Sequence, residues 1–133
     1  MTAGLYDLAR QAFLDGDLSW PSDNIKLICV SSAYTPDLTT DEFLSDIPGG
    51  AILATSSNLS SKTSTDGVAD AADVTFSAVT GTAVALVLYQ DTGVSGTSRL
   101  IEYTDDVTDF PVSLSGAGLI VSWSSGASKI FKL

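Results

Sequence analysis

The sequence contains no histidine and a single cysteine, and these absences exclude several kinds of active site. Ser-His-Asp and Cys-His nucleophile systems both need an imidazole base. Histidine-ligated zinc or iron sites and four-cysteine sites are excluded as well. The lone Cys29 lies in the apolar run IKLICV, where a cysteine is typical of a small buried hydrophobic residue. Carboxylate chemistry and Ser-Lys chemistry remain as the catalytic options.

Basic residues are also few, since 6 Lys and Arg stand against 16 Asp and Glu, for a formal net charge of −10. Nucleic-acid binding relies on Lys and Arg that neutralise phosphates, so neither DNA nor RNA is an expected partner. An anionic membrane is disfavoured for the same reason. The acidic balance favours a protein surface as the partner.

No apolar run approaches the ~18 residues that a membrane-spanning helix needs. The first residues, MTAGLYDLARQAFLDGD, lack the positive start of a secretory signal, so we expect folding in a cytoplasm. Hydrophobic residues make up 44% of the 133 residues, which is enough for a core without disulfides. We therefore predict one domain over residues 1–133, with an N-terminal helical segment (1–16) and a β-sandwich (24–133).

Residues 3–15 are predicted to form one amphipathic helix that is capped by Thr2 and ends at Gly16. Its apolar residues recur at helical spacing: Leu5, Leu8, Ala9, Ala12 and Phe13. This stripe can pack on the core of its own domain or dock on a neighbouring subunit. Trp20, in the turn-rich link that follows, is expected to anchor that link against the core.

The stretch DEFLSDIPGG, residues 41–50, raises the question of whether this protein carries out chemistry. Its acidic start, small apolar face and Pro48 predict one or two helical turns that stop at the proline and glycines. The acidic residues lack the alternating ligand spacing of an EF-hand loop, so we assign no metal to them. We interpret the stretch as a connector between two strands.

From residue 24 onward the pattern predicts about seven short strands, and hence an antiparallel β-sandwich or open barrel. The strands at IKLICV and TAVALVLYQD are apolar on both faces and are expected to be central. We predict a turn at Thr80-Gly81, a loop over 105–118, and a terminal hairpin of LIVSWSS with SKIFKL. DVTFSAV is expected to point Val74, Phe76 and Ala78 inward.

No constellation in the chain predicts a catalytic, cofactor-binding or metal-binding site. Asp105, Asp106 and Asp109 could bind a divalent ion or act in glycoside cleavage, but neighbouring loop aspartates are usually solvated charge. TGVSGTS and LSGAGL are glycine-rich, yet neither opens a helix or carries the P-loop Lys-Ser/Thr pair. Trp123 could belong to a sugar platform, although its strand pattern with Leu119 and Val121 favours the core.

Several stretches, in order along nearly the whole chain, resemble a family of small structural proteins of tailed bacteriophages. They are LYDLARQAFLDGDLSW, IKLICVSSAYTPDLTTDEFLSDIP, GVADAADVTFSAVTG, ALVLYQDTG, SRLIEY and SKIFKL. The most specific parts are YTPDLTTDEFLSDIP, AADVTF and the terminal IFKL. The loop at 105–118 departs from the family pattern by being polar and shorter. The resemblance implies a virion component without a catalytic motif.

The resemblance implies a capsid decoration (cement) protein on the outside of the head, with the major capsid protein as partner and no cofactor. Self-association as a dimer or trimer is expected, because closed symmetric assemblies are common. The candidate contact residues are Leu5, Leu8, Ala12, Phe13, Ile130, Phe131 and Leu133. A tail or tail-fibre module that binds a sugar or another tail protein is the alternative. A small carboxylate enzyme using Asp105 or Asp106 is a third and weaker one.

Overall fold

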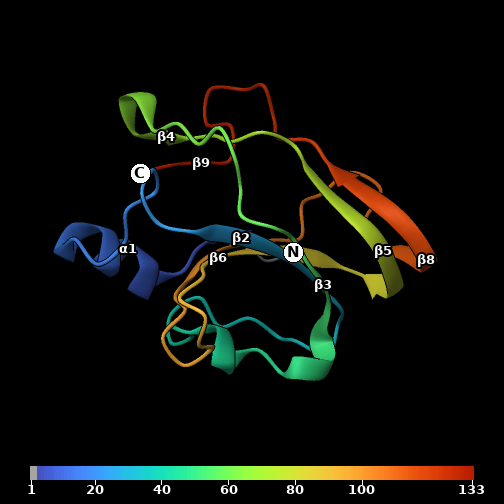
Figure 1. The fold of residues 1–133 in the computed structure, drawn as a ribbon. Coiled ribbons are helices and arrows are strands. Elements are labelled where there is room, and N and C mark those ends of the chain that lie inside the picture. The colour runs from blue at the N-terminus through green and yellow to red at the C-terminus, as the bar shows by residue number, and fades with distance from the viewer. Residues whose placement is uncertain (1–2) are drawn as a thin grey trace.

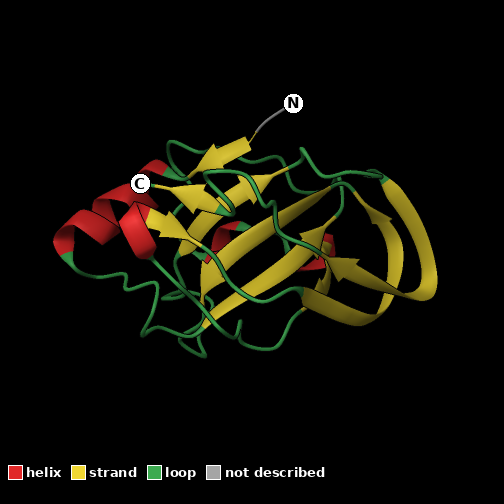
Figure 2. Cartoon of the chain, turned by 90° about the horizontal axis from the view of Figure 1, so that it is seen from above, coloured by secondary structure: helices red, strands yellow, loops and turns green. Residues whose placement is uncertain are grey.

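A five-stranded antiparallel sheet forms the centre of the computed structural model, which describes residues 3–133 (Figures 1 and 2). Its strands, in spatial order, are β1 (Ala3–Leu5), β7 (Leu100–Thr104), β6 (Ala85–Gln90), β2 (Ile25–Val30) and β3 (Ile52–Thr55). Two antiparallel pairs accompany it: β5 (Val74–Ala83) with β8 (Val112–Val121), and β4 (Val68–Ala69) with β9 (Phe131–Lys132). The fold is mainly β, as predicted, with 39% of residues in strands and 14% in helices.

The two strands predicted to be central are central. β6 lies between β7 and β2, and β2 pairs with it in continuous register from Ile25↔Gln90 to Val30↔Ala85. Five of the six residues in each strand are buried, because both faces of the sheet are covered. Cys29 is fully buried within β2, and burial raises the pKa of its thiol. This agrees with its interpretation as a small hydrophobic residue.

The N-terminal segment differs from the predicted helix over 3–15. Residues Ala3–Leu5 form strand β1 on the edge of β7, and helix α1 covers only Asp7–Asp15. Pairing with β7 satisfies the backbone at Leu5, and the Tyr6 N–H donates to the Ile101 carbonyl at 3.0 Å. The helix ends at Gly16 as predicted, with φ at 81°. The predicted Thr2 cap lies outside the described residues.

The β5–β8 ribbon overturns four local predictions. β5 continues through the predicted Thr80-Gly81 turn, and β8 begins at Val112, inside the predicted 105–118 loop. The predicted terminal hairpin is also wrong, because β8 pairs with β5 while β9 pairs with β4. Ala78 is exposed rather than inward, since the register shifts between Phe76 and Val79. In each case, pairing with a strand distant in the sequence determines the extent and register of the strand.

The stretch DEFLSDIPGG connects β2 to β3, as predicted. It contains two short 3₁₀ helices, η1 (Leu44–Asp46) and η2 (Gly49–Ala51), so the glycines begin a second turn instead of ending the first. The Asp46 carboxylate accepts hydrogen bonds from the backbone N–H groups of Glu42 and Phe43, at 2.8 and 3.0 Å. Its acidic side chain therefore holds the connector in shape. A third 3₁₀ helix, η3 (Thr65–Gly67), precedes β4.

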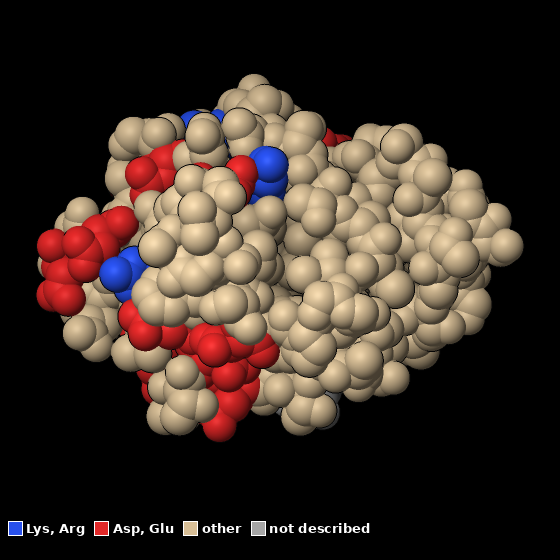
Figure 3. Space-filling view, turned by 60° about the horizontal axis from the view of Figure 1, so that its bottom comes forward, with Lys and Arg blue, Asp and Glu red and all other residues tan. Residues whose placement is uncertain are grey.

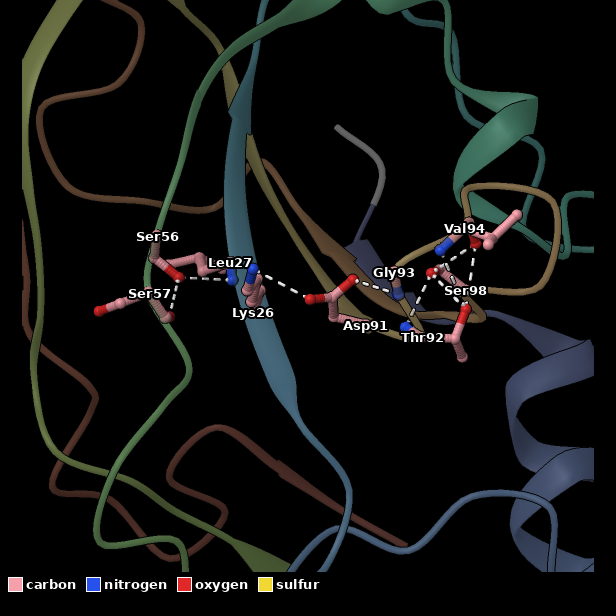
Figure 4. A network of polar contacts seen from close by, with 9 residues as sticks. All are labelled: Lys26, Leu27, Ser56, Ser57, Asp91, Thr92, Gly93, Val94 and Ser98. Atoms are coloured by element: carbon pink, nitrogen blue, oxygen red, sulfur yellow. Dashed lines mark hydrogen bonds and ion pairs between the residues drawn. The ribbon is translucent and has the colours of Figure 1, made fainter.

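The glycine-rich loop TGVSGTS between β6 and β7 is closed on itself (Figure 4). Ser98 is buried, and its hydroxyl accepts from the Thr92 N–H at 3.1 Å and donates to the Val94 carbonyl at 2.8 Å. Asp91 pairs with Lys26 at 2.9 Å and accepts from the Gly93 N–H. The Lys26 contact is the largest cause of the lowered pKa of Asp91. These polar groups of the loop are therefore bonded within the protein.

Candidate functional site

A cleft of about 660 Å³ lies between the five-stranded sheet and the β5–β8 ribbon. Leu86 of β6 and Glu102 of β7 line its sheet side, and residues 106–110 of the loop after β7 line it as well. The opposite wall comes from β8 and the residues after it, which include Leu119 and Trp123. A volume of this size is typical of small-ligand sites, which are mostly apolar with a few polar groups.

Glu102 is the most unusual polar group in this cleft. It pairs with Leu5 on one neighbouring strand and with Leu88 on the other, so its immediate surroundings are apolar. Burial raises the pKa of Glu102 to about 8, because a desolvated carboxylate is unfavourable. Glu102 is partly buried, and among residues 3–133 its carboxyl has no hydrogen bond and no ion pair. The group is therefore largely protonated at neutral pH.

The aromatic wall of the cleft is fixed in place. The indole N–H of Trp123 donates to the Ala72 carbonyl at 3.0 Å, which ties the ring to the segment before β5. Trp123 is half-buried, so its predicted place in the core is only partly correct, whereas Val121 is fully in the core. Trp20, predicted to anchor the link after α1, is buried and donates to the Asp70 carbonyl.

Three carboxyl groups and one ammonium group line the cleft: Glu102, Asp106, Asp109 and Lys129. The Lys129 ammonium lies 3.5 Å from the carboxylate of Asp70, which is not part of the lining. The basic residue of the cleft lining is therefore paired with a carboxylate outside the cleft. Of the aspartates considered from the sequence, Asp106 and Asp109 reach this site, but no pattern had singled out Glu102. The available signal was one charged residue inside the apolar strand LIEYT.

Three of the seven predicted contact residues belong to the buried core. Leu5, Ala12 and Phe131 are buried and cannot present a surface to a partner, which corrects their assignment as contacts. Phe13 packs against Phe131 with ring centroids 6.0 Å apart, so the helix and the C-terminal strand contact each other within the chain. Leu8, Phe13 and Ile130 are partly exposed, and Ile130 lines the cleft. Leu133 is 60% exposed.

Charge is distributed unevenly over the molecule. Residues 74–90 and 111–128, which contain β5, β6 and β8, include no Asp, Glu, Lys or Arg. On the face shown in Figure 3, acidic side chains gather toward the end that carries α1, while the ribbon end is uncharged. The ribbon is therefore a neutral surface on a strongly acidic protein.

Comparison with known proteins assigns no family: no family model matches the chain, and no curated protein matches its sequence. Within residues 3–133, no helix is long and apolar enough to cross a membrane. The function is therefore inferred from the residues and from their arrangement in the fold.

Proposed function

We propose that this protein is a structural component of a tailed-bacteriophage virion that decorates the outside of the capsid. In this proposal it is made in the bacterial cytoplasm, binds the lattice of the major capsid protein and stabilises the head without catalysis. The resemblance of nearly the whole chain to small phage structural proteins supports this function. The structural observation that carries it is the uncharged β5–β8 ribbon.

The ribbon offers backbone groups and neutral side chains to a partner. Each of its strands has ten residues and, within residues 3–133, pairs in a sheet with the other strand alone. β5 also packs against β3, so the second edge of β8 is the more open of the two. Unpaired strand edges can add a strand from another chain. Exposed Thr80 and Ser115 face each other across the ribbon, and Ile120 is 68% exposed. The surface therefore combines hydrogen-bonding groups with apolar area.

The charge distribution also favours binding to the capsid through the ribbon. Copies with a net charge of −10 repel each other, and the repulsion weakens when the acidic ends are kept away from the contact. Binding through the ribbon directs the acidic α1 end toward solvent. Many copies on one particle allow modest single contacts to resist the internal pressure of packaged DNA. Dimers or trimers that span the junctions between capsomers fit this arrangement.

A tail or tail-fibre module is the second candidate, and one observation favours it. The partly exposed Trp123 lies in a cleft large enough for a small ligand, as a sugar-binding module would require. Quantitative mass spectrometry of purified virions separates the two functions. On the order of hundreds of copies per particle would favour the head, and a small number would favour the tail. Absence of the protein from purified virions would overturn both.

The role of the ribbon is tested with a matched pair of substitutions. Thr80→Asp places a charge on the uncharged ribbon, and Thr39→Asp places the same charge on an exposed position before the connector. Particles that lack the protein are incubated with each variant and sedimented. We expect Thr80→Asp to lose binding and Thr39→Asp to retain it. Equal binding by both variants would contradict docking through the ribbon.

A further inference from the structure

The cleft beside the ribbon holds a carboxyl group that nothing within the described chain compensates. Glu102 is partly buried and lies between Leu5 and Leu88 on the neighbouring strands, and within residues 3–133 its carboxyl forms no hydrogen bond or ion pair. A charged group held in such surroundings is costly unless an opposite charge pairs with it. Once Glu102 has lost its proton, the ligand charge that complements this cleft is therefore a cation.

The other charged groups at the cleft also favour a positively charged ligand. Asp106 and Asp109 come from the loop after β7, and Lys129 precedes β9. Lys129 is paired with Asp70, and β8 contributes no charged residue to the opposite wall. The residues of β1 and β6 that pair with Glu102 are both leucines. A ligand that enters the cleft therefore meets an excess of carboxylates.

The apolar walls define the rest of the ligand. Leu119 and Ile130 line the cleft and can cover an alkyl stem, in the way that lysine stems pack on apolar surfaces. Trp123 lines the same cleft with its ring fixed by the bond to Ala72, and indole faces attract cations more strongly than other aromatic rings. Lysine is taken as the ligand in preference to arginine, because its compact ammonium ends a flexible four-carbon stem that can pack on these apolar residues.

We propose that the cleft binds a lysine side chain of the partner protein, whose ammonium group pairs with the Glu102 carboxylate while its alkyl stem packs on the apolar wall. The assignment of the partner as a capsid protein rests on the proposed function. The proposal that the cleft binds an alkylammonium group depends only on the residues of the cleft, and not on the identity of the partner. The cleft opens beside the ribbon, so one partner can contact both surfaces.

Binding of the lysine is coupled to loss of a proton from Glu102. The neutral carboxyl must release its proton to solvent before it pairs with the ammonium, which keeps its own proton below about pH 10. Affinity should therefore rise with pH, because only the ionised fraction of Glu102 binds. With the Glu102 pKa at about 8, that fraction increases about tenfold between pH 7 and pH 9.

The test uses the full chain and Nα-acetyl-lysine methylamide as the probe, followed by NMR at the Trp123 indole N–H. We expect about tenfold tighter binding at pH 9 than at pH 7. Glu102→Gln should remove this pH dependence and weaken binding at pH 9. Asp15→Asn, a substitution at an exposed position on α1, should keep both the pH dependence and the affinity at pH 9. Nα-acetyl-norleucine methylamide has the same stem without the charge and should bind more weakly than the lysine compound at pH 9.

Two results would overturn the proposal: equal affinity for the lysine and norleucine compounds, or lysine binding that does not change with pH in the unsubstituted protein. Both are measured on a protein without substitutions, so they do not depend on the folding of a variant. Virion copy number remains the separate test of the proposed function. Lysine binding by a protein absent from virions would keep the cleft assignment and reject only the capsid as partner.

Discussion

The hydroxyl of Tyr6 lies 2.8 Å from the hydroxyl of Tyr34, and both side chains are buried. Tyr34 also donates to the Asp41 carboxylate at 2.7 Å, and that carboxylate accepts the backbone N–H of Asp37. The chain of bonds joins the start of α1 to the segment between β2 and β3. Burial raises the pKa of both tyrosines, so both hydroxyls stay protonated and available as donors.

Tyr34→Phe should destabilise the protein more than Tyr6→Phe does. The first substitution removes the middle hydroxyl and leaves Tyr6 without its buried partner, which typically costs about 1–3 kcal/mol. Tyr6→Phe leaves the bond from Tyr34 to Asp41 intact. Tyr89→Phe is the control, since Tyr89 is buried but its hydroxyl has no hydrogen bond to another described residue. Urea unfolding gives the three free energies, and an unchanged value for Tyr34→Phe would reject the linking role of this bond.

The elements that could be predicted from the sequence are those with a strong local signal. The apolar runs of β2 and β6 indicate strands covered on both faces, and the fold buries them in the middle of the sheet. The end of α1 at Gly16 could also be predicted, because glycine readily adopts the positive φ that closes a helix. The short helical connector follows from its proline and its acidic start.

The missed elements depend on partners distant in the chain. The serines and glycines around Gly116 resemble a loop by composition, yet pairing with β5 makes them a strand. Leu5 fits the helical spacing of α1, but its pairing with Glu102 of β7 places it in a strand. The cleft around Glu102 forms where the ribbon faces the sheet, so no local pattern could reveal it. The secondary structure of these segments is therefore set by pairing with distant strands, which local residue spacing does not reveal.

The stability of the protein should fall as the pH rises from about 5 to 8, owing to Glu102. The pKa of this carboxyl is about 8 in the fold and near 4.3 in an unfolded chain, so the folded state holds a proton that the unfolded state releases. The contribution is fully present below the unfolded pKa and is lost as the pH rises through the folded one. The loss should be on the order of 2–4 kcal/mol.

Glu102→Gln isolates this effect, because glutamine keeps the shape of the side chain and cannot ionise. Unfolding free energies measured at pH 5 and pH 8 should differ less for Glu102→Gln than for the unsubstituted protein. Asp15→Asn changes an exposed carboxyl and should preserve the difference. If the unsubstituted protein and Glu102→Gln depend on pH in the same way, the carboxyl is not desolvated in solution and the cleft loses its main electrostatic feature.

Phe131→Ala should destabilise the fold strongly, while Leu133→Ala, two residues further on, should not. The ring of Phe131 is buried and packs edge-on against Trp20 at 5.3 Å between centroids, with Phe13 at 6.0 Å. Removing a buried ring leaves a cavity and typically costs about 3–5 kcal/mol. Leu133 is 60% exposed, and surface truncations usually stay within about 0.5 kcal/mol. Thermal unfolding of the two variants compares them directly. Similar melting temperatures for both would mean that the C-terminal strand does not pack on α1, and the terminal residues would return as candidate contacts for a partner.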